Sequence, residues 1–65
     1  MIDDIDIYRA AKLLVDHHFT LARDHAVERA AELQTAGDAV GHAVWLRIAA
    51  AVDDLLAVDA GGPLN

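Results

Sequence analysis

Apolar residues recur every three or four positions along most of this 65-residue chain, which is the period of a helix that buries one face. The period is interrupted near residues 19–20 and again at residues 36–38. The pattern therefore predicts an all-α fold, a three-helix unit with helices at about 4–18, 20–36 and 39–58. The chain shows no internal repeat and no heptad run long enough for an extended coiled coil.

The first predicted helix has a core-facing line and one apolar residue outside it. At about 100° per residue, the line consists of Ile7, Ala11, Leu14 and His18, flanked by Tyr8, Ala10 and Val15. Leu13 lies on the polar side with Arg9 and Lys12, which indicates a second contact surface. Asp3 or Asp4 is placed to accept hydrogen bonds from the free amides at the start of this helix.

The second predicted helix presents a face of small side chains. Its best stripe is made of Ala22, Ala26, Ala30 and Leu33, which favours a close approach between helix axes. Arg29 lies near this stripe. Either its stem packs there with the guanidinium in water, or the guanidinium pairs with a carboxylate on a neighbouring helix.

The third predicted helix follows a clear break and is the most apolar of the three. Gly37 suits the left-handed position that ends a helix, and Asp38 suits the cap that begins the next. The apolar arc that follows covers about half of the helix circumference, so we expect this helix to contact two or more elements. Part of the arc is predicted to continue into a homodimer interface, formed by Gly41, Trp45, Ile48, Val52, Leu55 and Leu56.

Gly41 and Trp45 share one face of this helix, one turn apart. The glycine admits a close helix approach, and the indole fills the space beside it, either in the core or as an interface anchor. Residues 1–60 form one predicted helical domain. Residues 61–65, which begin with the G-G-P that stops the helix, form a predicted flexible tail.

The small size of the chain favours association. A domain of this length buries only ~60% of the surface that its unfolded chain exposes, and the chain has no cysteine for disulfides. We therefore expect a homodimer to supply part of the stability. The acidic N-terminus lacks a signal-peptide pattern, and no window approaches the roughly 20 apolar residues of a membrane span. The prediction is a cytoplasmic protein without membrane contact.

The net charge of −6 is concentrated near the two ends of the chain. Six of the eleven acidic residues lie there, namely Asp3, Asp4, Asp6, Asp53, Asp54 and Asp59. Nucleic-acid binding depends on a basic face that neutralises phosphates, so this distribution argues against it. An acidic inhibitor of a DNA-binding protein stays open as an alternative function.

Three of the four histidines fall between residues 15 and 25. If the chain turns at Phe19, then His17, His18 and His25, with Asp24, can surround the turn as a structural or sensory metal site. The alternative is that Phe19 plugs the space between His18 and His25, which is the arrangement we expect. The histidines lack the i, i+4 spacing of zinc-binding helices, and His42 is predicted at the opposite end of the unit.

Catalytic patterns are missing from the sequence. Gly37 and Gly41 are not followed by the Lys and Ser or Thr of a phosphate-binding loop. A domain this small also has little room for a closed substrate pocket. The prediction is a non-enzymatic helical protein-interaction module without a cofactor, most simply a homodimer, with a further protein partner left open.

Several motifs from Asp6 to about Leu56 carry a resemblance. They are D-I-Y-R-A-A, E-R-A-A-E-L and G-D-A-V-G-H-A-V-W-L-R-I. The chain resembles a family of short, all-helical alphaproteobacterial hypothetical proteins, and the resemblance implies a helical fold and no chemistry. Its relatives tend to carry glycine where this chain has Phe19. That difference leaves open whether the first two helices are cleanly separated.

Overall fold

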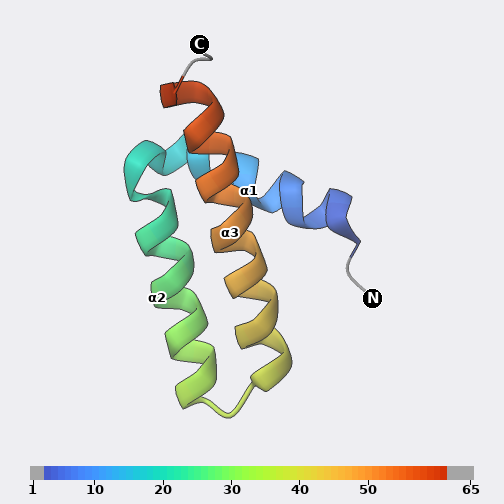
Figure 1. The fold of residues 1–65 in the computed structure, drawn as a ribbon. Helices are drawn as coiled ribbons and strands as arrows, with labels where there is room; N and C mark the ends of the chain where they lie inside the picture. Colours follow the sequence, from blue (N-terminus) through green and yellow to red (C-terminus); the bar gives the residue numbers. More distant parts are fainter. Residues whose placement is uncertain (1–2, 62–65) are drawn as a thin grey trace.

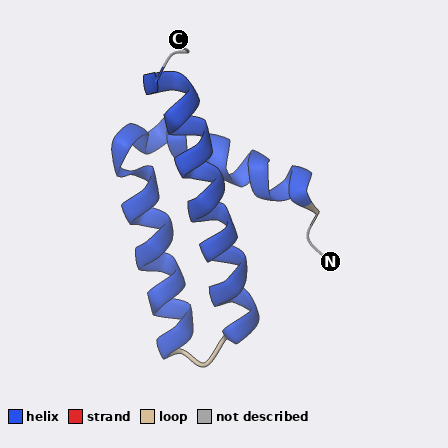
Figure 2. Ribbon diagram, in the orientation of Figure 1, coloured by secondary structure: helices blue, strands red, loops and turns tan. Residues whose placement is uncertain are grey.

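The computed structural model describes residues 3–61, and all of its regular structure is helical (Figure 2). Helix α1 spans Asp4–His18, the 3-10 turn η1 spans Phe19–Leu21, α2 spans Ala22–Thr35 and α3 spans Ala39–Gly61. The all-α, three-helix prediction is confirmed, although α2 begins two residues later than predicted because η1 precedes it, and α3 continues to Gly61 instead of ending near residue 58. The predicted flexible tail at 61–65 lies outside the described residues except for Gly61, which belongs to α3.

Helices α2 and α3 form an antiparallel hairpin (Figure 1). The chain leaves α2 through Gly37, whose φ of 84° is the left-handed conformation predicted for it. The N–H of Gly37 donates to the Gln34 carbonyl at 3.1 Å. The N–H of Asp38 donates to the Leu33 carbonyl at 2.8 Å. These two bonds form a Schellman motif. The Asp38 carboxylate then accepts the N–H of Gly41 at 2.8 Å, so the predicted cap of α3 is confirmed.

Helix α1 lies across one end of the hairpin, and its N-terminal half extends away from it (Figure 1). Ile7 and Ala11 of the predicted core-facing line are buried, together with the flanking Val15, whereas Leu14 and His18 of that line are only partly buried. The predicted N-cap bond is absent, because Asp3 forms no side-chain cap and Asp4 instead accepts a hydrogen bond from Arg47 of α3 at 2.6 Å. The radius of gyration is 12.2 Å, against about 11 Å for a compact chain of this length.

The core is built mostly from alanine. Among the residues whose side chains the structure describes, ten hydrophobic ones are buried, namely Ile7, Ala11, Val15, Ala22, Ala26, Ala30, Ile48, Ala49, Ala51 and Val52. The predicted alanine face of α2 is confirmed by Ala22, Ala26 and Ala30, and it lets α2 approach α3 closely. Since each alanine removes little apolar area from water, such a core provides modest hydrophobic stabilisation.

In the described part of the chain, two ion pairs join helices on the surface, Arg47 with Asp4 and Arg23 with Asp53 at 3.0 Å. Arg29 pairs with Glu32 of its own helix at 3.0 Å, which corrects the alternative of a pairing across helices. Exposed pairs of this kind contribute about 0–1 kcal/mol each, so they orient the helices more than they stabilise them. No helix within residues 3–61 has the length and apolar character needed to span a membrane.

Candidate interaction surfaces

The corner between α1 and α2 contains a strained backbone at Phe19. Its φ of 51° and ψ of −122° make it the one residue other than glycine with a positive φ in the described part of the chain. The Phe19 N–H donates to the Val15 carbonyl and closes the last turn of α1. A Cβ makes this conformation costly, which is why glycine is preferred there. The two helices are therefore separated at Phe19, although the residue is poorly suited to the break.

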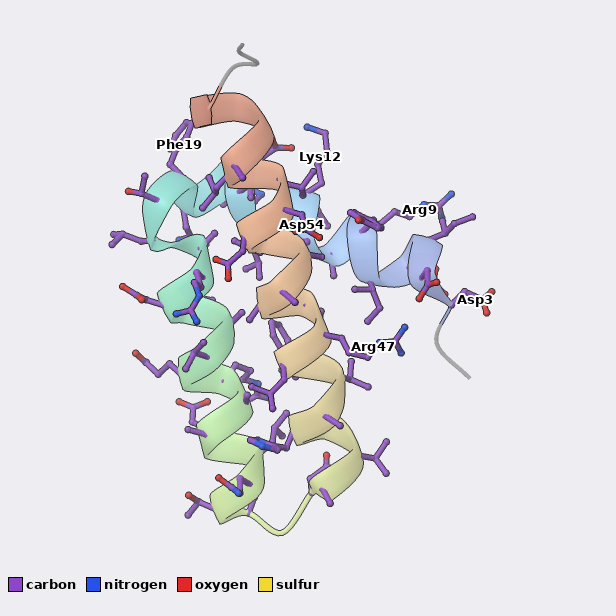
Figure 3. The ribbon with its side chains drawn as sticks, viewed as in Figure 1. Asp3, Arg9, Lys12, Phe19, Arg47 and Asp54 are labelled. Carbon is purple, nitrogen blue, oxygen red and sulfur yellow. The ribbon has the colours of Figure 1, made fainter. Side chains whose placement is uncertain are left out.

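The side chain of Phe19 points out of the corner. It is 68% exposed, and Leu21, two residues later, is 64% exposed. Figure 3 shows the Phe19 side chain projecting from the corner rather than into the helix hairpin. The prediction that Phe19 plugs the space between the helices is wrong, because the left-handed backbone carries its side chain away from that space. Phe19 and Leu21 together form an exposed apolar projection, the corner knob.

The space that Phe19 leaves is occupied by two histidine rings. His18 and His25 stack across the turn with ring centroids 4.4 Å apart and ring planes 18° apart. His17 is tilted, with its centroid 6.4 Å from that of His18. Stacked rings face each other and do not direct their nitrogens at one point. Between residues 3 and 61, no three His, Asp or Glu side chains are grouped to hold a metal, so the predicted set of these histidines and Asp24 is not assembled.

His42 has a structural role that sequence patterns did not indicate. Its Nδ1 lies 2.8 Å from the Ala30 carbonyl oxygen of α2. A carbonyl can only accept, so Nδ1 carries a proton and donates to it. The bond ties the start of α3 to α2 and places His42 away from the corner histidines, in agreement with its predicted separation.

The predicted interface residues of α3 are used mainly inside the chain. Ile48 is 5% exposed and Val52 is 0% exposed, which corrects the prediction that these two residues contact another chain. The partly buried predicted residues pack against the same core, namely Trp45, Leu55 and Leu56. The arc is wide because α1 and α2 both pack against it. Only the tertiary arrangement could reveal that two helices of one chain cover it.

Gly41 allows the close approach between α3 and α2 that was predicted for it. A Cβ at this position would lie 2.5 Å from the Asp38 carboxylate and 3.0 Å from a methyl group of Leu33 in α2. Both contacts are shorter than ordinary van der Waals distances, so a larger residue disturbs the cap of α3. Gly41 is therefore a packing residue rather than part of an exposed interface.

The outer face of α1 is a further apolar surface left exposed. Ile5 and Leu13 are exposed there, away from the helix line that packs on α3, at 65% and 59%. The exposed Tyr8 lies at the border between this face and that line. This shallow patch, open to solvent, is formed by residues of α1 alone, namely Ile5, Tyr8, Arg9, Lys12 and Leu13. Leu13, an apolar residue on the polar side of the predicted helix, indicated this face from the sequence. Ile5 and Tyr8 were missed, because Tyr8 flanks the core-facing line.

A second, more polar groove of about 320 Å³ lies between α1 and α3. It is lined by Asp4, Ile7, Tyr8, Arg47, Ala50, Ala51 and Asp54. The Arg47 guanidinium in this groove is already paired with the Asp4 carboxylate.

Comparison of the chain with protein-family models, with curated proteins and with solved structures finds no match. The family resemblance of the sequence motifs therefore stays a prediction.

Proposed function

We propose that this protein is a small, non-enzymatic helical interaction module that pairs with a second copy of itself in the cytosol through the outer face of α1. The observation that carries the proposal is the exposure of Ile5, Tyr8 and Leu13 on a helix whose opposite face is already packed on α3. When a helix is apolar on two sides and one of them is packed inside its own chain, the other side can contact a partner.

The weak core supports self-association. Six of its ten buried hydrophobic residues are alanine, and Val52 is the one large side chain that is fully buried among the described residues. A second copy that covers the outer face of α1 stabilises the folded chain by mass action, since it binds the folded state and not the unfolded one.

The charges support a protein partner over a nucleic acid. Lys12, Arg23, Arg29 and Arg47 are engaged in ion pairs with carboxylates, and they are four of the five basic residues of the chain. A chain with a net charge of −6 and so few free cations cannot neutralise a row of phosphates.

Sedimentation equilibrium across the micromolar range tests the proposal. We expect the wild-type chain to be a concentration-dependent dimer and the double variant Ile5→Ser/Leu13→Ser to be a monomer with unchanged helical circular dichroism. The matched control is Val40→Ser, which removes an apolar side chain that is 77% exposed at the start of α3. A wild-type chain that stays monomeric and helical throughout this range refutes the proposal.

A further inference from the structure

We propose that the corner between α1 and α2 is a pH-sensitive hinge, which the stack of His18 on His25 holds closed while the rings are uncharged and which opens when both rings carry a proton. The device goes beyond the proposed self-pairing and does not depend on it. In the open form, α1 leaves the hairpin of α2 and α3 and uncovers the apolar side of α3 on which it packs in the closed form.

The hinge is the backbone at Phe19. Its φ of 51° is a conformation that a residue with a Cβ rarely adopts, and the 3-10 turn η1 begins at the same residue. A 3-10 stretch between helical segments often marks a hinge or a strained sequence. Opening the corner releases this strain, so the backbone at Phe19 favours the open form and other contacts must hold the corner closed.

Few contacts hold α1 on the hairpin. Its buried side chains are Ile7, Ala11 and Val15. Within residues 3–61, its ion pair with α3 joins Asp4 to Arg47, and the Asp4 side chain is 87% exposed, so this pair stabilises little. Figure 1 shows α1 crossing one end of the hairpin with its N-terminal half extending away from it. A small change in free energy at the corner therefore shifts α1 between a docked and a released position.

The histidine stack spans the hinge. His18 is the last residue of α1, His25 lies near the start of α2, and the two ring centroids are 4.4 Å apart. Uncharged aromatic rings attract one another at such distances, whereas two imidazolium rings repel. Histidine is the side chain whose charge ordinarily changes between pH 5 and 8. The same contact therefore holds the corner closed at neutral pH and pushes it apart in mild acid.

Neither ring forms an ion pair with a carboxylate in the part of the chain that the structure describes. The charged residues nearest to the stack are Asp16 and His17 on α1, Arg23, Asp24, Glu28 and Arg29 on α2, and Asp53 and Asp54 on α3, whereas η1 carries none. Three of them are held in ion pairs with other residues, Asp16 by Lys12, Arg23 by Asp53 and Arg29 by Glu32. The ring centroid of His17 is 6.4 Å from that of His18, so a protonated His17 adds to the repulsion.

The direction and size of the effect follow from the stack. Charging both rings costs free energy in the closed form but not in the open form, where the rings are apart, so a lower pH favours opening. Two unit charges about 4 Å apart in a medium close to water shift an equilibrium about fivefold, and both rings are at least partly exposed. We therefore expect the equilibrium constant for opening to be about fivefold larger near pH 5.5 than near pH 7.5.

Hydrogen exchange of backbone amides measures this opening in the natural chain. An isolated helix of 15 residues is marginal in water, so α1 unfolds and exchanges once it leaves the hairpin. Each exchange rate, divided by the rate of an unstructured chain at the same pH, gives an opening constant. The informative amides are those of Ala11 and Val15 in α1, with Ala26 and Ile48 of the hairpin as the reference. We expect the α1 amides to open more readily than the reference amides, and to do so about fivefold more near pH 5.5. The chain is kept dilute enough to be monomeric, which separates this result from self-pairing.

Variants at residue 25 isolate the stack. His25→Phe keeps a ring that can stack and removes the second charge, and His25→Gln removes both, so the α1 opening of either variant should no longer depend on pH. The matched control His17→Gln removes an exposed histidine outside the stack and should keep most of the response. An opening constant of the natural α1 that is the same at both pH values overturns the proposal, as does a pH response that survives in both His25 variants. Equal opening constants for α1 and the hairpin at both pH values would mean that the chain unfolds as one unit, which overturns the hinge.

Discussion

Replacing Phe19 by glycine tests whether the corner between α1 and α2 is strained. A φ of 51° is unfavourable for any residue with a Cβ and acceptable for glycine. The comparison is made with Phe19→Ala, since both variants lack the ring and differ only in the Cβ. At an ordinary exposed helical position alanine is the more stabilising of the two residues. At residue 19 we expect the order to be reversed.

The magnitude follows from two opposing terms. Holding a residue with a Cβ in a sparsely populated backbone region costs about 1–3 kcal/mol. Glycine loses about 0.4–1 kcal/mol through the greater freedom of its unfolded chain. The free energy of unfolding of Phe19→Gly should therefore exceed that of Phe19→Ala by about 0.5–2 kcal/mol. In a domain of this size, a difference of 1 kcal/mol corresponds to a change in Tm of about 4–8 °C.

Urea denaturation measures the difference, followed by helical circular dichroism and by the fluorescence of Trp45, the single tryptophan. The protein concentration is kept low enough for the chain to be monomeric, because a dimer adds stability of its own. Ala43→Gly, at an exposed position within α3, is the control and should lower stability by about 1 kcal/mol. If Phe19→Ala is as stable as Phe19→Gly or more so, the corner is not strained.

Three further substitutions test the packing and the cap, each by the same urea denaturation. Asp38→Ala removes the side-chain bond at the start of α3 and should cost ~1 kcal/mol; an unchanged midpoint would show that the cap does not contribute. Val52→Ala truncates the largest fully buried side chain among the described residues and should cost ~2 kcal/mol, whereas Val40→Ala should change little. Ala26→Leu overfills the contact of α2 with the core and should cost ~1–3 kcal/mol. The same change at exposed Ala31 should be nearly neutral, and equal costs at the two sites would contradict the close packing of α2.

The helices and the turn after α2 could be predicted because they depend on neighbours in the chain. Gly37 and Asp38 end one helix and begin the next through backbone and side-chain bonds within a few residues. The face of α2 was equally local, since Ala22, Ala26 and Ala30 recur at the helical period. The hydrophobic period and the capping residues can both be read directly from the order of the residues.

The candidate surfaces could be predicted only in part. The misplaced Leu13 indicated the outer face of α1, but the apolar arc of α3 looked equally available to a partner. A pattern shows that a side chain is apolar and does not show which element covers it. In the structure, α1 and α2 cover Ile48 and Val52, and the outer face of α1 is left open.

By itself the sequence determined an all-helical chain, the approximate positions of three helices and the cap of α3, because each follows from periodicity and contacts along the chain. The tertiary structure decided how α1 crosses the hairpin and which apolar face stays exposed. It also decided the corner at Phe19, where His18 and His25 stack and the phenyl ring points outward. The physical reason is that whether a side chain is buried depends on which elements pack against each other. The direction of a side chain at a break between helices depends on the φ that this packing imposes.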